Sequence, residues 1–214
     1  MTLYDLTGTL EPGMWRYDHI PSVEIARVST IEDHGSEAHS FRLATICGTY
    51  LETAAHLFHG QPTIDQVPVE RFICDAAILH LGELPPAQAI AVDDLERAVA
   101  SVEIHPGDAL LVDTGWERMW NTPTFVEDSP FLTMEAMRWI VDHKVSILGG
   151  NMPCFDNPRG GAGVNKVLFK SGALILAPLV NLRTLAQSRV RLMAFPLKIK
   201  GVCGTPCRAI AQEM

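Results

Sequence analysis

The sequence predicts a mixed α/β fold in one domain that spans residues 1–214. Strand-like segments occupy the first part of the chain, apolar strands and amphipathic helices then alternate, and segments rich in glycine and proline separate them. A length of 214 residues, with 47% hydrophobic and 20% charged residues, suits one globular domain with a sizeable core. We therefore expect a mixed sheet with flanking helices.

The first part of the chain alternates apolar and polar residues with the period of a strand. Strands are predicted over residues 3–6, 23–30 and 39–46, with a polar turn over 32–37. The segment 11–17 contains Pro12 and Gly13 and is predicted to be a flexible loop. It carries Trp15 and Tyr17, which we expect to be exposed at an interface or over a pocket.

The remaining chain combines helical spacing with continuous apolar runs. Helices are predicted over residues 92–102, 133–142 and 163–172, with Thr133 as an N-cap and Gly172 as a terminator. Strands are predicted over residues 72–81, 109–112, 145–148, 174–176 and 192–199. The loop 149–158 leaves the end of one of these strands, where α/β sheets commonly bind ligands.

Charge and composition exclude several classes of partner. The formal net charge of −8 disfavours nucleic acids and anionic membranes. No apolar run is long enough for a transmembrane helix, and Asp5 and Glu11 interrupt any signal-peptide pattern. Five cysteines without a CxxC pair indicate free thiols. We expect a soluble cytoplasmic protein.

The stretch from Ile46 to His56 is the most informative part of the sequence. If it is extended, side chains alternate between two faces. Ile46, Tyr50, Glu52 and His56 then share one face with small residues between them, which leaves room for a small molecule. Cys47 falls on the opposite, mostly apolar face, so we interpret it as a buried structural thiol.

This stretch resembles the signature of the cyclase family, which includes bacterial kynurenine formamidase and isatin hydrolase and runs His-x-Gly-Thr-His-x-Asp-x-Pro-x-His. Gly48, Thr49 and His56 match it. Further segments resemble the family in the same order along the chain: Thr114-Gly115-Trp116, Met152-Pro153-Cys154, Leu179-Val180-Asn181-Leu182 and Gly204-Thr205-Pro206-Cys207-Arg208. The resemblance implies a swivelling β/β/α domain that assembles as a homodimer or homotetramer.

The resemblance also implies a divalent metal site, but its ligand positions have changed. They fall on Ile46, Tyr50, Glu52, Asn165 and Ala177. Isoleucine and alanine cannot coordinate a metal, neutral tyrosine and asparagine are poor ligands, and a catalytic metal needs about three protein ligands. We therefore predict that the inherited metal is absent. A relocated metal on Glu52, His56 and His59 would require a turn in this stretch.

The same resemblance suggests what chemistry remains. His56 falls on the family's general acid/base, with Glu52 to orient it and Tyr50 to donate to a developing oxyanion. The predicted substrate-binding residues are Trp15, Tyr17, Ile46, Cys154 and Asn165. Cys203 takes the place of a family aspartate and has no base beside it in sequence.

We predict metal-independent acid–base chemistry on a small carbonyl compound, either hydrolysis of an amide, lactone or cyclic imide or a related lyase or isomerase step. Two alternatives stay open. One is an arylformamidase-like hydrolase with a rearranged metal site. The other is a non-catalytic relative that binds a small molecule, with Glu52 merely bonded to a core histidine at position 56.

Overall fold

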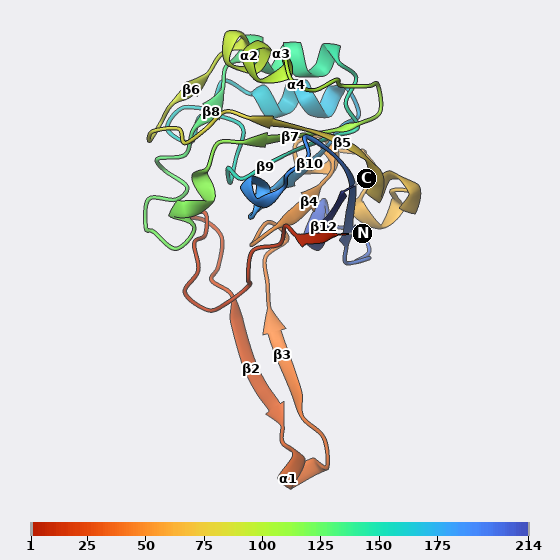
Figure 1. Ribbon diagram of the computed structural model, residues 1–214. Helices are drawn as coiled ribbons and strands as arrows, with labels where there is room; N and C mark the ends of the chain where they lie inside the picture. Colours follow the sequence, from red (N-terminus) through yellow and green to blue (C-terminus); the bar gives the residue numbers. More distant parts are fainter. Residues whose placement is uncertain (1, 214) are drawn as a thin grey trace.

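The computed structural model describes residues 2–213 and is built around one eight-stranded mixed sheet (Figure 1). Its order is β1-β12-β11-β5-β7-β9-β10-β4, and an additional pairing of β12 with β4 closes the sheet on itself. The strands are β1 (Leu3–Asp5), β4 (Tyr50–Glu52), β5 (Ile73–His80), β7 (Ala109–Asp113), β9 (Ile147–Gly150), β10 (Leu174–Ala177), β11 (Arg189–Pro196) and β12 (Gly204–Glu213). The mixed α/β fold class is therefore confirmed.

Helices α2 (Val92–Val99), α3 (Met134–Asp142) and α4 (Val164–Lys170) lie on one face of the sheet, at the top of Figure 1. Leu95, Met137 and Leu168 from these helices are buried with sheet residues in one apolar cluster. A second cluster, which includes Leu51, Leu176 and Leu192, fills the other side of the sheet. Burial on both faces explains why the central strands are continuous apolar runs.

Smaller elements complete the chain. The short strands β6 (Ala89–Ile90) and β8 (Phe131–Leu132) pair with each other, and turns of 3-10 helix span Ala54–His56, Ile64–Gln66, Val69–Phe72, Trp116–Met119 and Leu182–Thr184. Within residues 2–213, the structure has no helix long and apolar enough to cross a bilayer.

Most predicted elements are present, and helix α3 shows why. Thr133 has an extended backbone and its side chain accepts a hydrogen bond from the Ala136 N–H, as an N-cap should. Met137 and Ile140 then face the core. A local capping signal and a helical period are enough to define this element from sequence.

Several strand predictions are wrong in extent: β11 spans Arg189–Pro196 rather than 192–199, and β9 spans Ile147–Gly150 rather than 145–148. The strand predicted over 39–46 ends at Arg42, and the stretch predicted to be extended as far as His56 is a strand only over Tyr50–Glu52. Thr53 ends β4 because its side chain accepts from the Ala55 N–H and caps a turn of 3-10 helix. The last strand, β12, was not predicted; it contains Pro206, which lowers strand propensity.

The expectation that Trp15 is exposed is also wrong. Trp15 is 7% exposed and lies against Tyr17, Trp120 and Phe125, with ring centroids 5.7, 5.6 and 5.1 Å away. Such edge and tilted contacts are the favoured geometries of aromatic pairs. Two of these partners, Trp120 and Phe125, lie more than 100 positions further along the chain, so the local sequence gave no sign of this burial.

An arm extends away from the body of the molecule (Figure 1). It consists of β2 (Glu24–Ser29), the short helix α1 (Ile31–His34) and β3 (Ala38–Arg42), and its strands pair only with each other. Large apolar side chains are exposed on it, namely Ile25, Val28, Ile31 and Phe41. A lone two-stranded hairpin has marginal stability in water, so this arm is an unusual feature for an isolated chain.

Candidate functional site

The predicted acid–base pair forms at the end of β4. Glu52 is the last residue of the strand, and the turn capped by Thr53 returns His56 toward it. His56 Nδ1 lies 2.9 Å from Glu52 Oε1, although the Glu52 side chain is only 5% exposed and that of His56 is 34% exposed. The turn, rather than the strand alternation that predicted it, brings the two groups together.

Strand pairing adds a thiol to this pair. β12 pairs with β4 so that Gly204 lies opposite Glu52, and the preceding residue, Cys203, accepts hydrogen bonds at its carbonyl from the Thr53 N–H and hydroxyl. The Cys203 sulfur lies 3.8 Å from His56 Nδ1. The ligand atoms of Glu52, His56 and Cys203 all lie within 4.8 Å of one another. We call these three residues the thiol cluster.

The electrostatics of the thiol cluster favour a protonated imidazole. Hydrogen bonding to Cys203 and to Glu52 raises the pKa of His56 to about 10. Burial raises the pKa of Glu52, and the His56 imidazole offsets part of that increase. Within residues 2–213, the buried Glu52 Oε1 has no polar partner besides the His56 imidazole, whose Nδ1 lies 2.9 Å away. The carboxylate therefore depends on the imidazole for its stabilisation.

The matched residues Gly48 and Thr49 hold this strand in place. Gly48 has a φ of +59°, which favours glycine, and a Cβ there would lie 2.4 Å from Leu10 Cδ2. Thr49 Oγ1 accepts from the Gly8 N–H at 2.9 Å and donates to the Pro178 carbonyl at 2.6 Å. These two residues therefore stabilise the backbone conformation, which explains why they match the family signature although neighbouring residues differ from it.

Tyr50 has a buried hydroxyl on the interior side of the site. Its oxygen lies 3.1 Å from that of Tyr17, and both hydroxyls approach the Pro153 carbonyl, at 3.2 and 2.6 Å respectively. Burial raises the pKa of both phenols well above the ordinary value, and the Glu52 charge raises them further. The Tyr50 hydroxyl is therefore neutral and already donates to the Pro153 carbonyl. It lies close enough to Glu52 for that charge to affect its pKa.

The predicted substrate-binding residues fall into two groups. Tyr17 and Cys154 line a cavity of about 320 Å³ together with Arg16, His19 and Val126. Trp15 and Ile46 are buried in the neighbouring core. Asn165, on α4, donates from Nδ2 to the Cys154 sulfur at 3.6 Å. The thiol cluster opens to solvent at the His56 imidazole, whose side chain is 34% exposed.

The residues at the inherited metal positions do not fit a metal centre. Ile46 and Ala177 offer only hydrocarbon, and the Tyr50 hydroxyl is used by Pro153. Glu52 and Asn165 each keep a buried oxygen without a donor, but a carboxylate and an amide fall short of the usual three strong ligands. His59, the third member of the relocated set, is exposed and lies outside the group of converging ligand atoms in the described chain.

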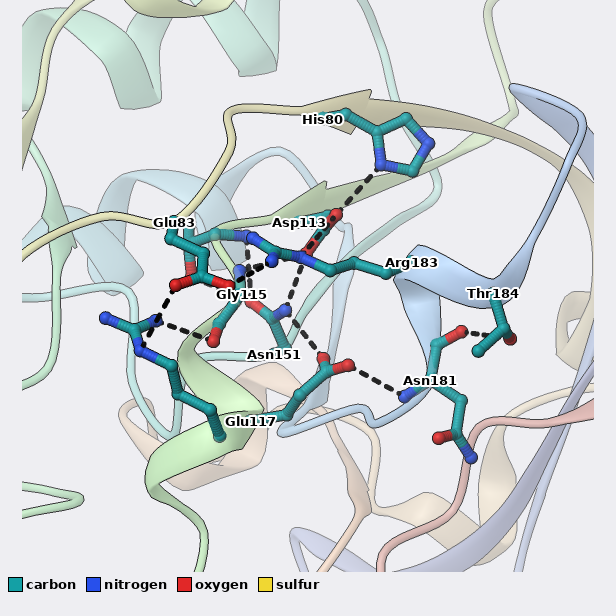
Figure 2. A network of polar contacts seen from close by, with 11 residues as sticks. His80, Glu83, Asp113, Gly115, Glu117, Asn151, Asn181, Arg183 and Thr184 are labelled. Carbon is teal, nitrogen blue, oxygen red and sulfur yellow. Dashed lines mark hydrogen bonds and ion pairs between the residues drawn. The ribbon is translucent and has the colours of Figure 1, made fainter.

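A second polar network lies at the carboxyl ends of β5, β7 and β9 (Figure 2). Asp113, 1% exposed, accepts from Asn151 Nδ2 at 2.8 Å and from the Gly115 N–H at 2.9 Å, and its other oxygen lies 2.8 Å from His80 Nδ1. Asn151 also donates to Glu117 at 2.7 Å. Because each buried polar group is satisfied within the network, we assign it a structural role in holding the strand ends.

Sequence reasoning missed the partnership of Cys203 with His56. The two residues are 147 positions apart, and only the pairing of β12 with β4 brings them together. A signal was present in the sequence, because Cys203 lies just before the Gly204–Arg208 segment that resembles the family, but β12 was not recognised as a strand.

Fold and site together define a mixed α/β protein whose strand β4 carries a carboxylate–imidazole pair at its end. A family model described as "Putative cyclase" matches residues 4–157. The chain therefore belongs to the Cyclase family, as the Gly48-Thr49 frame suggested.

Individual relatives agree with this assignment. An isatin hydrolase from Roseibium aggregatum is 25% identical over 215 residues, covering 89% of this chain and 81% of the relative. A kynurenine formamidase from Salinibacter ruber is 24% identical over 219 residues, covering 100% of this chain and 98% of the relative. A crystal structure of an isatin hydrolase bound to the product analogue thioisatinate superposes with a TM-score of 0.88 at 22% identity, covering 98% of this chain and 91% of the other. Family and names support a hydrolase-like function.

Proposed function

We propose that this protein is a metal-independent enzyme that hydrolyses an amide, lactone or cyclic imide in a small carbonyl compound, or performs a related lyase or isomerase step. The observation that supports the proposal best is the contact of 2.9 Å between a buried carboxylate, Glu52, and a half-exposed imidazole, His56. The hydrolase names of the relatives supply the reaction class.

In this proposal His56 transfers the proton. Glu52 holds the imidazolium by charge, and Nε2 remains free to give a proton to the leaving group or to take one from the attacking group. Glu52 acts as a positioning residue because its carboxylate is buried behind the imidazole. Tyr50 stays neutral and holds the Pro153 carbonyl; a role in stabilising an oxyanion would require its hydroxyl to exchange this acceptor.

The proposed substrate is a small molecule that enters from the side of Tyr17 and Cys154. Their cavity of about 320 Å³ has the size of a small ligand site. Arg16 lines it together with the carboxylates Asp18 and Glu127, so a small polar substrate with a polarised carbonyl suits its lining. The five free cysteines support our placement of the protein in the reducing cytoplasm.

Metal independence predicts a specific result. Protein purified without chelator should contain much less than one equivalent of zinc or manganese, and activity on a panel of formyl-anilides, lactones and cyclic imides should persist after dialysis against EDTA. Elemental analysis by mass spectrometry and the activity assay measure the two quantities. Near-stoichiometric metal together with loss of activity in chelator would refute the proposal.

A second candidate is a hydrolase with a rearranged metal site, and the thiol cluster is the observation that favours it. Its carboxylate oxygen, imidazole nitrogen and sulfur converge within 4.8 Å, and such donors suit zinc. The metal analysis above separates the two candidates, since zinc lost on substitution of Cys203 would support this one.

We further propose that a second copy of the chain covers the arm, giving a homodimer or homotetramer. Ile25 lies opposite Phe41 where β2 pairs with β3, so the two side chains form one apolar patch. Ile25 is 45% exposed and Phe41 is 65% exposed. The neighbouring charges Glu24 and Arg42 pair with each other at 3.6 Å. An apolar patch with internally paired charges suits a contact between identical arms.

The arm therefore offers a direct test of assembly. Light scattering coupled to size exclusion should find the native chain as a dimer or tetramer and the double variant Ile25→Ser, Phe41→Ser shifted toward monomer, because the variant removes the apolar patch. Glu103→Gln, which alters only an exposed ion pair away from the arm, should assemble like the native chain. A native chain that is monomeric at micromolar concentration would refute the proposal.

A further inference from the structure

The helices cover only part of the sheet face on which they lie. Ala77 and Leu79 of β5 belong to the apolar cluster beneath the helices. Side chains of a strand alternate between two faces, so Ile73 and Asp75 lie on the same face as these two residues. Ile73 is nevertheless 42% exposed. The helices therefore leave the sheet open to solvent where β5 begins.

Strand register extends this open face across three further strands. Met193 of β11 lies opposite Ile73, and Ile210 of β12 lies opposite Met193, so three apolar side chains form a row. Phe195 lies two positions along β11 and is 43% exposed, and Leu3 of β1 lies on the same side and is 59% exposed. We call these five residues, Leu3, Ile73, Met193, Phe195 and Ile210, the bare sheet face.

The charged side chains on this face pair within the chain. Arg191 Nε lies 3.1 Å from Asp75 Oδ1 on the neighbouring strand. Arg208 donates to both carboxylate oxygens of Asp5, at 3.0 and 2.6 Å. Two cations thus balance two anions, so the face carries no net charge, whereas the whole chain has a formal net charge of −8.

A neutral apolar face on an acidic chain favours a second copy of the chain as its occupant. Two copies repel each other because both are acidic, and they repel each other least where their surfaces are neutral. A cationic partner would instead bind to the acidic remainder of the surface. A row of apolar side chains between satisfied ion pairs is complementary to an identical row, and sheets pack face to face at about 10 Å.

We propose that the bare sheet face packs against the same face of a second copy across a two-fold axis. This contact is separate from the arm, whose strands pair only with each other and contain none of these residues. Two different contacts of this kind build a closed tetramer. The inference therefore selects the homotetramer over the homodimer, and it does not depend on the reaction that the enzyme performs.

Light scattering coupled to size exclusion tests the contact on the full-length protein. The native chain should be a tetramer, and the variant Ile73→Ser, Phe195→Ser should be a dimer. The dissociation constant of the contact should rise about 1,000-fold, because a two-fold contact loses each side chain twice. The matched control Ile73→Val, Phe195→Leu keeps the surface apolar and should remain a tetramer. The serine variant combined with Ile25→Ser, Phe41→Ser should be a monomer.

A charge variant keeps the proposal testable if the serine variant folds poorly. Arg208→Glu leaves three anions and one cation on the open face, so identical faces should repel each other. This variant should be a dimer at low salt and should return toward the tetramer at high salt, because salt screens exposed charges. Arg97→Glu makes the same change in charge on α2, where Arg97 is 74% exposed, and should assemble like the native chain.

Several outcomes would overturn the inference. They are a serine variant and an Arg208→Glu variant that both assemble like the native chain, a conservative control that dissociates as fully as the serine variant, and a native chain that is a monomer. A native dimer that only the arm variant dissociates would also refute it. A native dimer that only Ile73→Ser, Phe195→Ser dissociates would support the bare sheet face and refute the arm contact. The substrate panel tests the proposed reaction separately, because the bare sheet face contains no residue of the thiol cluster.

Discussion

Replacing His56 with alanine should lower kcat/KM on the best panel substrate about 10²–10⁴-fold, the range that a positioned general acid/base contributes. The imidazole is the only group at this site that is both exposed to solvent, at 34%, and in contact with a buried carboxylate. Its removal therefore takes away the proton donor and leaves Glu52 without a partner. Steady-state kinetics with each variant, matched for folded protein by circular dichroism, measure the effect.

His56→Gln keeps a polar side chain beside Glu52 and tests whether the loss reflects proton transfer rather than packing. Both His56 variants should lose activity to a similar degree. His105→Ala is the matched control, because His105 is an exposed histidine that pairs with Glu103 at 3.4 Å on another surface. Unchanged kinetics in His56→Gln would show that the imidazole does not transfer a proton in this reaction.

Replacing Asp113 with alanine should lower the free energy of unfolding by about 3 kcal/mol, because buried hydrogen-bonding groups then lose their acceptor. For a domain of this size that corresponds to a fall in Tm of about 6–12 °C. In Figure 2, Asp113 lies at the centre of the network and bonds to His80, Gly115 and Asn151. Thermal unfolding followed by circular dichroism measures the change.

The contribution of Asp113 should also depend on pH. Burial acts to raise the pKa of this carboxyl, but hydrogen bonds from His80, Gly115 and Asn151 outweigh burial and hold it below the ordinary value. A carboxyl with a lowered folded-state pKa contributes stability above its unfolded pKa of about 3.9, and that stability is lost as the pH falls through the folded value.

The difference in stability between native protein and the Asp113→Asn variant should therefore shrink as the pH falls below about 4. Glu24→Gln, which alters an ion pair on the exposed arm, should change stability by about 0–1 kcal/mol at any pH. An Asp113→Ala variant as stable as this control would mean that the network does not hold the strand ends.

Local sequence patterns predicted many of the secondary-structure elements and the family of this protein. The apolar run at 109–112 and the cap at Thr133 predicted β7 and α3 because each depends on neighbours within a few residues. Gly48 and Thr49 pointed to the family, and the hydrocarbon side chains of Ile46 and Ala177 at its ligand positions are the basis of the prediction that the inherited metal is absent.

Tertiary structure decided the rest of the site. The sequence paired Glu52 with His56, but the alternation argument placed His56 on a strand, whereas a turn capped by Thr53 carries it. Trp15 was expected at the surface and is buried by Trp120 and Phe125. Cys203 meets His56 because strand register aligns β12 with β4. Periodicity in a sequence reports which face a side chain takes, whereas the register between distant strands is set by the packing of the whole sheet.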